Sequence, residues 1–129
     1  MTLNDQIQYW LTIAEKDLIV MRSLCEQKHF VWCLFAGHLA LEKILKSIYT
    51  EEYKESPPRT HDLVKLAQKL SINFSSAKLD FLDEVNDFNI EARYPDYKLS
   101  IYKTATEEYT KLKIEQIEEE FKWLRSQLK

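Results

Sequence analysis

Glycine and proline are scarce in this sequence of 129 residues, which contains one glycine and three prolines. A β-rich domain of this length needs more turn residues, so the composition favours helices. The same scarcity excludes a glycine-rich loop that cradles phosphate groups. We therefore expect a single domain over residues 1–129, folded as an all-α, up-and-down bundle of four to five helices.

Cysteines are also few, with two in the sequence, and long apolar runs and an excess of basic residues are missing. Cys25 and Cys33 form no zinc pattern and no disulfide framework, so buried free thiols in a reducing compartment are expected. No apolar run approaches the ~20 residues of a membrane span, and the N-terminus lacks a charged-then-apolar signal, which predicts a soluble cytoplasmic protein. A net charge of −3 argues against binding nucleic acid by bulk electrostatics, and no DNA partner is expected.

Apolar residues at three- and four-residue spacing predict two long helices at the start of the chain. The first covers residues 3–26, with Thr2 or Asn4 as its cap. A short turn then leads to an antiparallel second helix over residues 30–50. The sole glycine, Gly37, lies in the middle of this helix, where close approach of another helix would offset its cost; a simple kink is the alternative.

The first half of the second helix carries a second apolar surface, formed by Trp32, Phe35 and Leu39. A helix that is apolar nearly all round is buried all round. In a domain this small, the second surface is expected to contact a partner chain, which predicts a homodimer.

Three further helices are predicted after the break at residues 51–59. Thr60 is the expected cap of a short third helix, and Ser75 or Ser76 opens a fourth. The fourth helix carries an acidic stripe, which is interpreted as a solvated face. The functional alternatives are that the stripe repels nucleic acid or docks a basic partner. The stripe consists of Asp80, Asp83, Glu84, Asp87 and Glu91.

The segment from Arg93 to Lys103 is interpreted as a connection. Pro95 restricts Tyr94 to extended geometry, which is expected to end the fourth helix and to fix the direction of Arg93. Thr104 and Glu107 then form a possible capping box for a long last helix.

Arg93 is the first candidate for ligand binding, because a guanidinium group presents a fork of donors that suits phosphate. Tyr94 and Tyr97 could stack on a nucleotide base. Alternatively, Arg93 caps the fourth helix and pairs with its acidic face, while the two tyrosines pack.

His61 is a second candidate, at the start of the third helix, where exposed N–H groups favour an anion. Alternatively, Asp62 serves the helix start and His61 bonds a neighbouring backbone carbonyl. Lys43 and Lys46, on the second helix, could contact phosphate or pair with acids such as Glu42.

His38 and Glu42 have the four-residue spacing of a metal-binding pair, but two ligands do not make a site. We therefore expect no metal and no cofactor.

Five motifs in a fixed order resemble the HEPN domain family. They are "AEKDL" (14–18), "ALEKILKSIY" (40–49), "THDLVKL" (60–66), "ARYPD" (92–96) and "FKWLRSQL" (121–128). The resemblance implies a helical bundle that dimerises and that works on nucleotides or RNA. It also implies a small nucleotidyltransferase as partner, in a toxin–antitoxin-like pair, as for many bacterial members.

The catalytically active branch of that family is a metal-independent endoribonuclease with an Arg-x4–6-His motif. In this sequence the positions after Arg93 that should hold histidine are Lys98, Leu99 and Ser100. We therefore expect a nucleotide- or RNA-binding module rather than an enzyme. The alternatives are an endoribonuclease that uses Arg93 and His61, or a structural adaptor without a ligand of its own.

Overall fold

The computed structural model describes residues 1–89 and 95–129, with the side chains of residues 95–99 excepted. Six helices are present in this part of the chain, and no strand. They are α1 (Leu3–Glu26), α2 (Phe30–Tyr53), α3 (Leu63–Gln68), α4 (Ser76–Asn86), α5 (Pro95–Thr104) and α6 (Glu107–Gln127). The predicted all-α class is confirmed.

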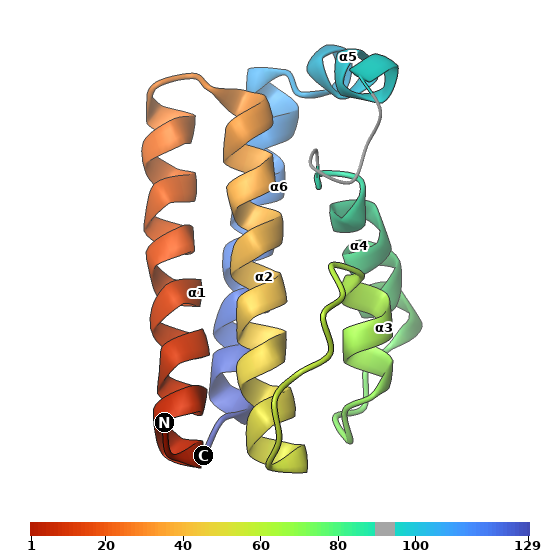
Figure 1. Ribbon diagram of the computed structural model, residues 1–129. Coiled ribbons are helices and arrows are strands. Elements are labelled where there is room, and N and C mark those ends of the chain that lie inside the picture. Colours follow the sequence, from red (N-terminus) through yellow and green to blue (C-terminus); the bar gives the residue numbers. More distant parts are fainter. Residues whose placement is uncertain (90–94) are drawn as a thin grey trace.

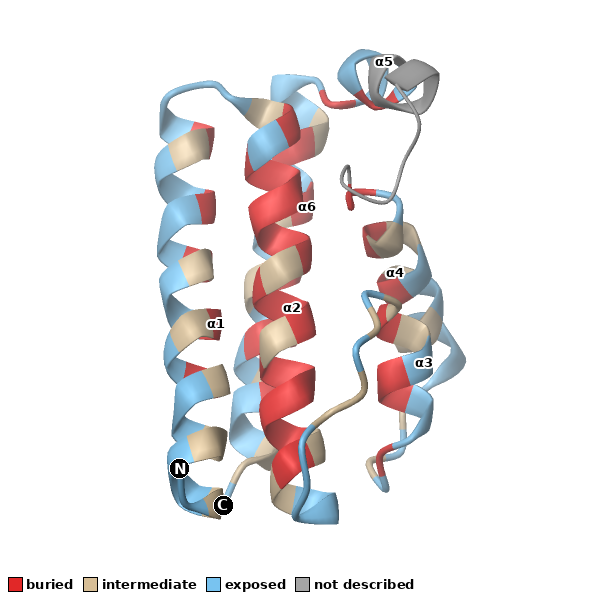
Figure 2. Ribbon diagram, in the orientation of Figure 1, coloured by how far each residue is buried: buried red, intermediate tan, exposed pale blue. Residues whose placement is uncertain are grey.

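Helices α1, α2, α4 and α6 run alternately up and down, and both termini lie at the same end of the molecule (Figure 1). The short helix α3 lies beside α4, and α5 lies at the end opposite the termini. Helix α2 contacts every other helix. It is buried on nearly all sides (Figure 2), as its apolar composition predicts.

The capping residues differ partly from the predictions. Thr2 caps α1 in a capping box with Asp5, and Ser75 caps α4, as expected. The predicted cap of the third helix is wrong, because Asp62 caps α3 while Thr60 accepts from the backbone N–H of Asp62.

The predicted capping box before the last helix is also wrong. Thr106 caps α6 by accepting from the backbone N–H of Tyr109. Thr104 instead ends α5, and its hydroxyl donates to the carbonyl of Ser100. Threonine suits both positions, so the sequence alone does not distinguish them.

The prediction that Pro95 ends the fourth helix is wrong. Helix α4 ends earlier, at Asn86, with Asp87 as its C-cap. Pro95 is the first residue of α5, in the segment that was predicted to be a connection. Proline fits the first turn of a helix, because its fixed φ is already helical and its missing N–H has no partner there.

Gly37 of α2 lies close to side chains of both α1 and α6. A Cβ atom on this residue would lie 2.7 Å from Cδ1 of Ile117 in α6 and 3.0 Å from Sδ of Met21 in α1. Both distances are shorter than ordinary contacts, so the absence of a side chain lets the helices pack closely. The approach expected at Gly37 is thus made by helices of the same chain.

The predicted dimer surface is only partly exposed. Phe35 is buried within the chain, Leu39 is partly buried, and Trp32 is 46% exposed, with its ring packed edge-on against Phe35. The homodimer therefore remains a prediction, with Trp32 as the exposed member of this surface.

Cys25 and Cys33 are free and buried, as expected. Burial raises the pKa of the Cys33 thiol to about 12, so it stays protonated near neutral pH. No helix in the described ranges is both long and apolar enough to cross a membrane.

Candidate functional site

Three polar side chains lie inside the bundle at four-residue intervals on α2. His38, Glu42 and Lys46 are 0%, 2% and 6% exposed, respectively. Buried ionisable groups destabilise a fold unless they are paired and hydrogen-bonded. With His61, which packs against them, these residues form what we call the α2 array.

Glu42 is the centre of the α2 array. Its Oε2 lies 3.0 Å from Nζ of Lys46, and its Oε1 lies 2.9 Å from Nδ1 of His61. Since a carboxylate only accepts, Nδ1 of His61 is the protonated nitrogen in this contact. The His61 side chain is 60% exposed, so the array runs from the core to the surface.

His38 adds a backbone contact to the same array. Its Nε2 lies 2.9 Å from the carbonyl oxygen of His61, and this oxygen can only accept, so Nε2 carries the proton. Within the described residues, Nδ1 of His38 has no hydrogen-bond partner, and it lies 3.9 Å from Oε1 of Glu42. Burial lowers the pKa of His38 to about 4, so the ring is neutral near neutral pH.

Asp62 holds the backbone that carries His61. Its Oδ1 accepts from the backbone N–H groups of Val64 and Lys65 and from the side-chain amide of Asn86. The amide oxygen of Asn86 in turn accepts from the N–H of Leu63. Asp62 therefore caps the start of α3, as the alternative interpretation of His61 and Asp62 predicts.

These bonds occupy the N–H groups at the start of α3, which leaves none there for an anion. The expectation that the His61 side chain bonds a neighbouring backbone carbonyl is wrong, because the His61 ring contacts the Glu42 carboxylate. It is the carbonyl of His61 that accepts a hydrogen bond, from His38.

The two candidate lysines of α2 have different partners. Lys46 pairs with Glu42, whereas Nζ of Lys43 lies 3.2 Å from Oδ2 of Asp17 in α1. The structure thus brings Lys46 and His61 together and separates Lys43 from them. Both lysines pair with acids, which is one of the two interpretations given for them.

The remaining candidates lie outside the described residues. Arg93 and Tyr94 fall in the undescribed range 90–94, and Tyr97 belongs to α5 by its backbone only. Binding of a ligand by these three residues stays a prediction.

An open cavity of about 360 Å³ adjoins Lys46. It lies between the start of α1, the second half of α2 and the segment that follows α2. Its lining residues are Met1, Gln6, Tyr9, Trp10, Lys46, Ser56, Pro57, Pro58 and Arg59. Trp10 and Arg59 were not among the predicted site residues; the signal in the sequence was an arginine directly after two prolines.

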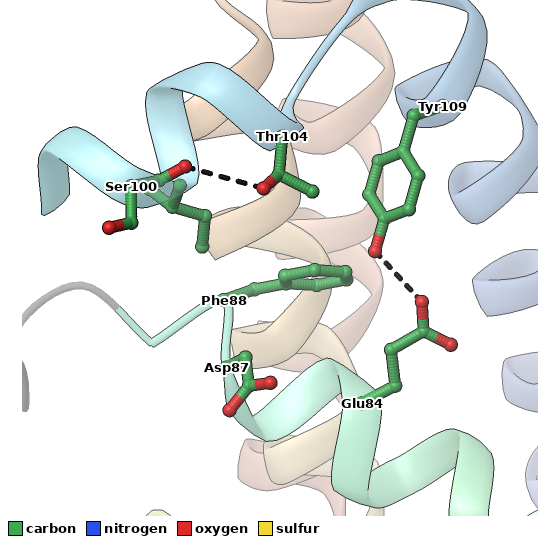
Figure 3. A pocket seen from close by; sticks show the side chains of 7 residues that line it. Glu84, Asp87, Phe88, Ser100, Thr104 and Tyr109 are labelled. Carbon is green, nitrogen blue, oxygen red and sulfur yellow. Dashed lines mark hydrogen bonds between the residues drawn. The ribbon is translucent and has the colours of Figure 1, made fainter. Parts of the chain in front are cut away.

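A second cavity, of about 160 Å³, lies where α4, α5 and α6 meet (Figure 3). The hydroxyl of Tyr109 donates to Oε2 of Glu84 over 2.8 Å, and burial with this carboxylate raises the pKa of Tyr109. Glu84 also pairs with Lys113 at 2.8 Å. With Glu84 and Asp87 in its wall, this cavity does not suit phosphate.

The acidic stripe is a solvated face for much of its described length. Asp80, Asp83 and Asp87 are exposed, whereas Glu84 is half-buried in its contacts with α6. Glu91 lies outside the described residues.

The sequence matches the HEPN domain family model over residues 7–127, nearly the whole chain. The chain therefore belongs to the HEPN domain family. The fold is similar to that of TT1696 from Thermus thermophilus, with a TM-score of 0.79 over 95% of this chain and 98% of that one. The two sequences are 16% identical, so this likeness concerns the fold alone. Among curated protein sequences, none matches significantly.

Proposed function

We propose that this HEPN-domain chain is a binding module for nucleotides or RNA. The observation that carries the proposal is the convergence of two predicted ligand residues, Lys46 and His61, on Glu42. Lys46 donates to one carboxylate oxygen and His61 to the other, which fixes both donor side chains, and Lys46 also lines an open cavity. Family membership supports the same ligand class.

Arg93 supplies the main phosphate contact in this proposal, with Tyr94 and Tyr97 stacking on a base. The proposal also includes a homodimer and a small nucleotidyltransferase partner. Exposed Trp32 and the acidic stripe of α4 are the surfaces available for these contacts.

Calorimetric titration with a short single-stranded RNA tests the binding. Replacing Arg93 by alanine is expected to weaken binding at least about tenfold, since a charge-assisted contact to phosphate is lost. Raising the salt concentration should weaken the binding of the unaltered chain. Arg125→Ala, which removes an exposed arginine of α6, is the matched control and should bind normally. Equal, negligible heats from all three chains would remove the proposal.

The geometry of His61 favours a second candidate function, metal-independent cleavage of RNA. Nδ1 donates to Glu42, so in the neutral ring Nε2 is the nitrogen that can act as a general base, on a side chain that is 60% exposed. Such a base would take the proton of a ribose 2′-hydroxyl as its oxygen bonds to the adjacent phosphorus. The P–O5′ bond then breaks, which leaves a 2′,3′-cyclic phosphate, and the 5′-oxygen leaves as a hydroxyl with a proton from water.

Incubation of the full chain with RNA in the presence of a chelator tests this candidate. His61→Ala should lower the cleavage rate by about 10²–10⁴-fold, the usual contribution of a general base. His29→Ala, which replaces an exposed histidine before α2, should cleave at the normal rate. RNA that stays intact with the unaltered chain would eliminate the enzyme candidate and leave the binding proposal untouched.

A further inference from the structure

Two cationic side chains line the cavity beside the second half of α2, and one of them, Lys46, is also paired with the Glu42 carboxylate. Lys46 and Arg59 line it, and no acidic residue is among its lining residues. Within the described part of the chain, Arg59 is exposed and has no ion-pair partner. The volume, about 360 Å³, is within the ~300–1,000 Å³ typical of small-molecule sites.

The Lys46 ammonium group has more N–H donors than the described residues have acceptors for it. Its side chain is 8% exposed, and the described residues supply one acceptor, Glu42, for its three N–H donors. A buried ammonium group normally has all its donors satisfied, because unmet donors are costly out of water. Because Lys46 lines an open cavity, solvent can accept from its remaining donors, and an anionic ligand in the cavity would replace that solvent.

The walls of the cavity suit a flat ring. Tyr9 and Trp10 lie edge to face, with ring centroids 5.3 Å apart, and Tyr9 is 49% exposed. Nζ of Lys46 lies 5.4 Å from the centre of the Trp10 ring. Pro57 and Pro58 line the cavity as well. The cavity thus combines two cations with aromatic and proline surfaces, as an anion attached to a planar ring requires.

We propose that this cavity binds a nucleoside monophosphate, with the phosphate on Lys46 and Arg59 and the base against Tyr9 and Trp10. The inference rests on the proposed function, because it is that function which selects a nucleotide among ring-bearing anions. The site is separate from α5. It lies at the end of the bundle that holds both termini, whereas α5 lies at the opposite end (Figure 1).

Titration of the full chain with AMP tests the site, with adenosine and inorganic phosphate as partial ligands. AMP should bind more tightly than either fragment, because it engages both halves of the cavity. Arg59→Ala should weaken AMP binding about tenfold, as expected for loss of one charge-assisted contact. Arg59 is exposed, so the variant should remain folded. Arg125→Ala is the matched control, with an affinity for AMP equal to that of the unaltered chain.

The ring contact is tested by the fluorescence of Trp10. AMP should change the tryptophan emission of the unaltered chain, and Trp10→Phe should remove that change. Binding of phosphate as tight as that of AMP would overturn the assignment of a ring-bearing ligand. An AMP affinity that is the same with and without Arg59 would overturn the site itself.

The two proposals fail in different ways. If RNA binding depends on Arg93 but AMP does not bind, the cavity inference is wrong and the proposed function stands. If neither RNA nor AMP binds, both are wrong. Loss of AMP binding in Arg59→Ala, with RNA binding retained, supports two separate sites.

Discussion

Replacement of Glu42 by alanine is expected to lower the free energy of unfolding by about 3–5 kcal/mol, the usual cost of removing one partner of a buried ion pair. Lys46 would be left at 6% exposure without the carboxylate that accepts from it. His61 would lose its orienting partner at the same time. Urea unfolding followed by circular dichroism measures the change.

Two variants make this expectation specific. Glu42→Leu combined with Lys46→Met replaces the pair with apolar side chains of similar size and should restore most of the lost stability. Glu118→Ala removes the exposed ion pair with Arg22, at 36% and 47% side-chain exposure, and should cost at most about 1 kcal/mol. A loss for Glu42→Ala no larger than that of Glu118→Ala would contradict the description of Glu42 as a buried, paired carboxylate.

Acidification is expected to destabilise the chain through His38. The folded chain holds the pKa of this ring at about 4, whereas an unfolded histidine titrates near 6.5. Between these values the unfolded state binds a proton that the folded state does not, so stability falls as the pH is lowered from about 6.5 towards 4. The loss at the acid end amounts to about 3 kcal/mol.

Burial sets the sign of this pKa shift, and the neighbours of His38 modify its size. Burial lowers the pKa and is the largest influence; the Glu42 carboxylate and the carbonyl of His61 raise it, and the His61 ring lowers it further. The side chain of Asn86 raises the pKa as well, by the smallest amount.

A variant that does not titrate at this position tests the effect. His38→Gln keeps a donor for the carbonyl of His61, so its stability should decline less steeply below about pH 6.5. His29→Gln, at an exposed histidine, should follow the unaltered chain. Parallel stability curves for the unaltered chain and His38→Gln would contradict the buried neutral ring.

The long helices were predictable because each keeps one apolar face at helical spacing over many residues. Helix α5 was not, because Pro95 is equally compatible with ending one helix and with beginning another. Composition also suggested that α2 is buried all round. It did not show that Phe35 packs inside the chain rather than against a partner, since that depends on tertiary packing and not on the pattern along α2.

The candidate site was predictable only in part. The pairing of Lys46 with Glu42 follows from their four-residue spacing on one helix. The contact of His61 with Glu42 spans 19 residues and depends on the path of the segment between α2 and α3, which has no periodicity to read. Trp10 meets Lys46 and Arg59 only because α1 and that segment both pack beside the end of α2.

An NMR titration of the uniformly labelled full chain with AMP and with a short single-stranded RNA tests nucleotide binding most directly. We predict saturable shifts with both ligands, and with AMP these should include the indole N–H of Trp10 and the backbone amide of Arg59. A spectrum that stays unchanged with both ligands at millimolar concentration would contradict the assignment of this HEPN-domain chain as a nucleotide- or RNA-binding module.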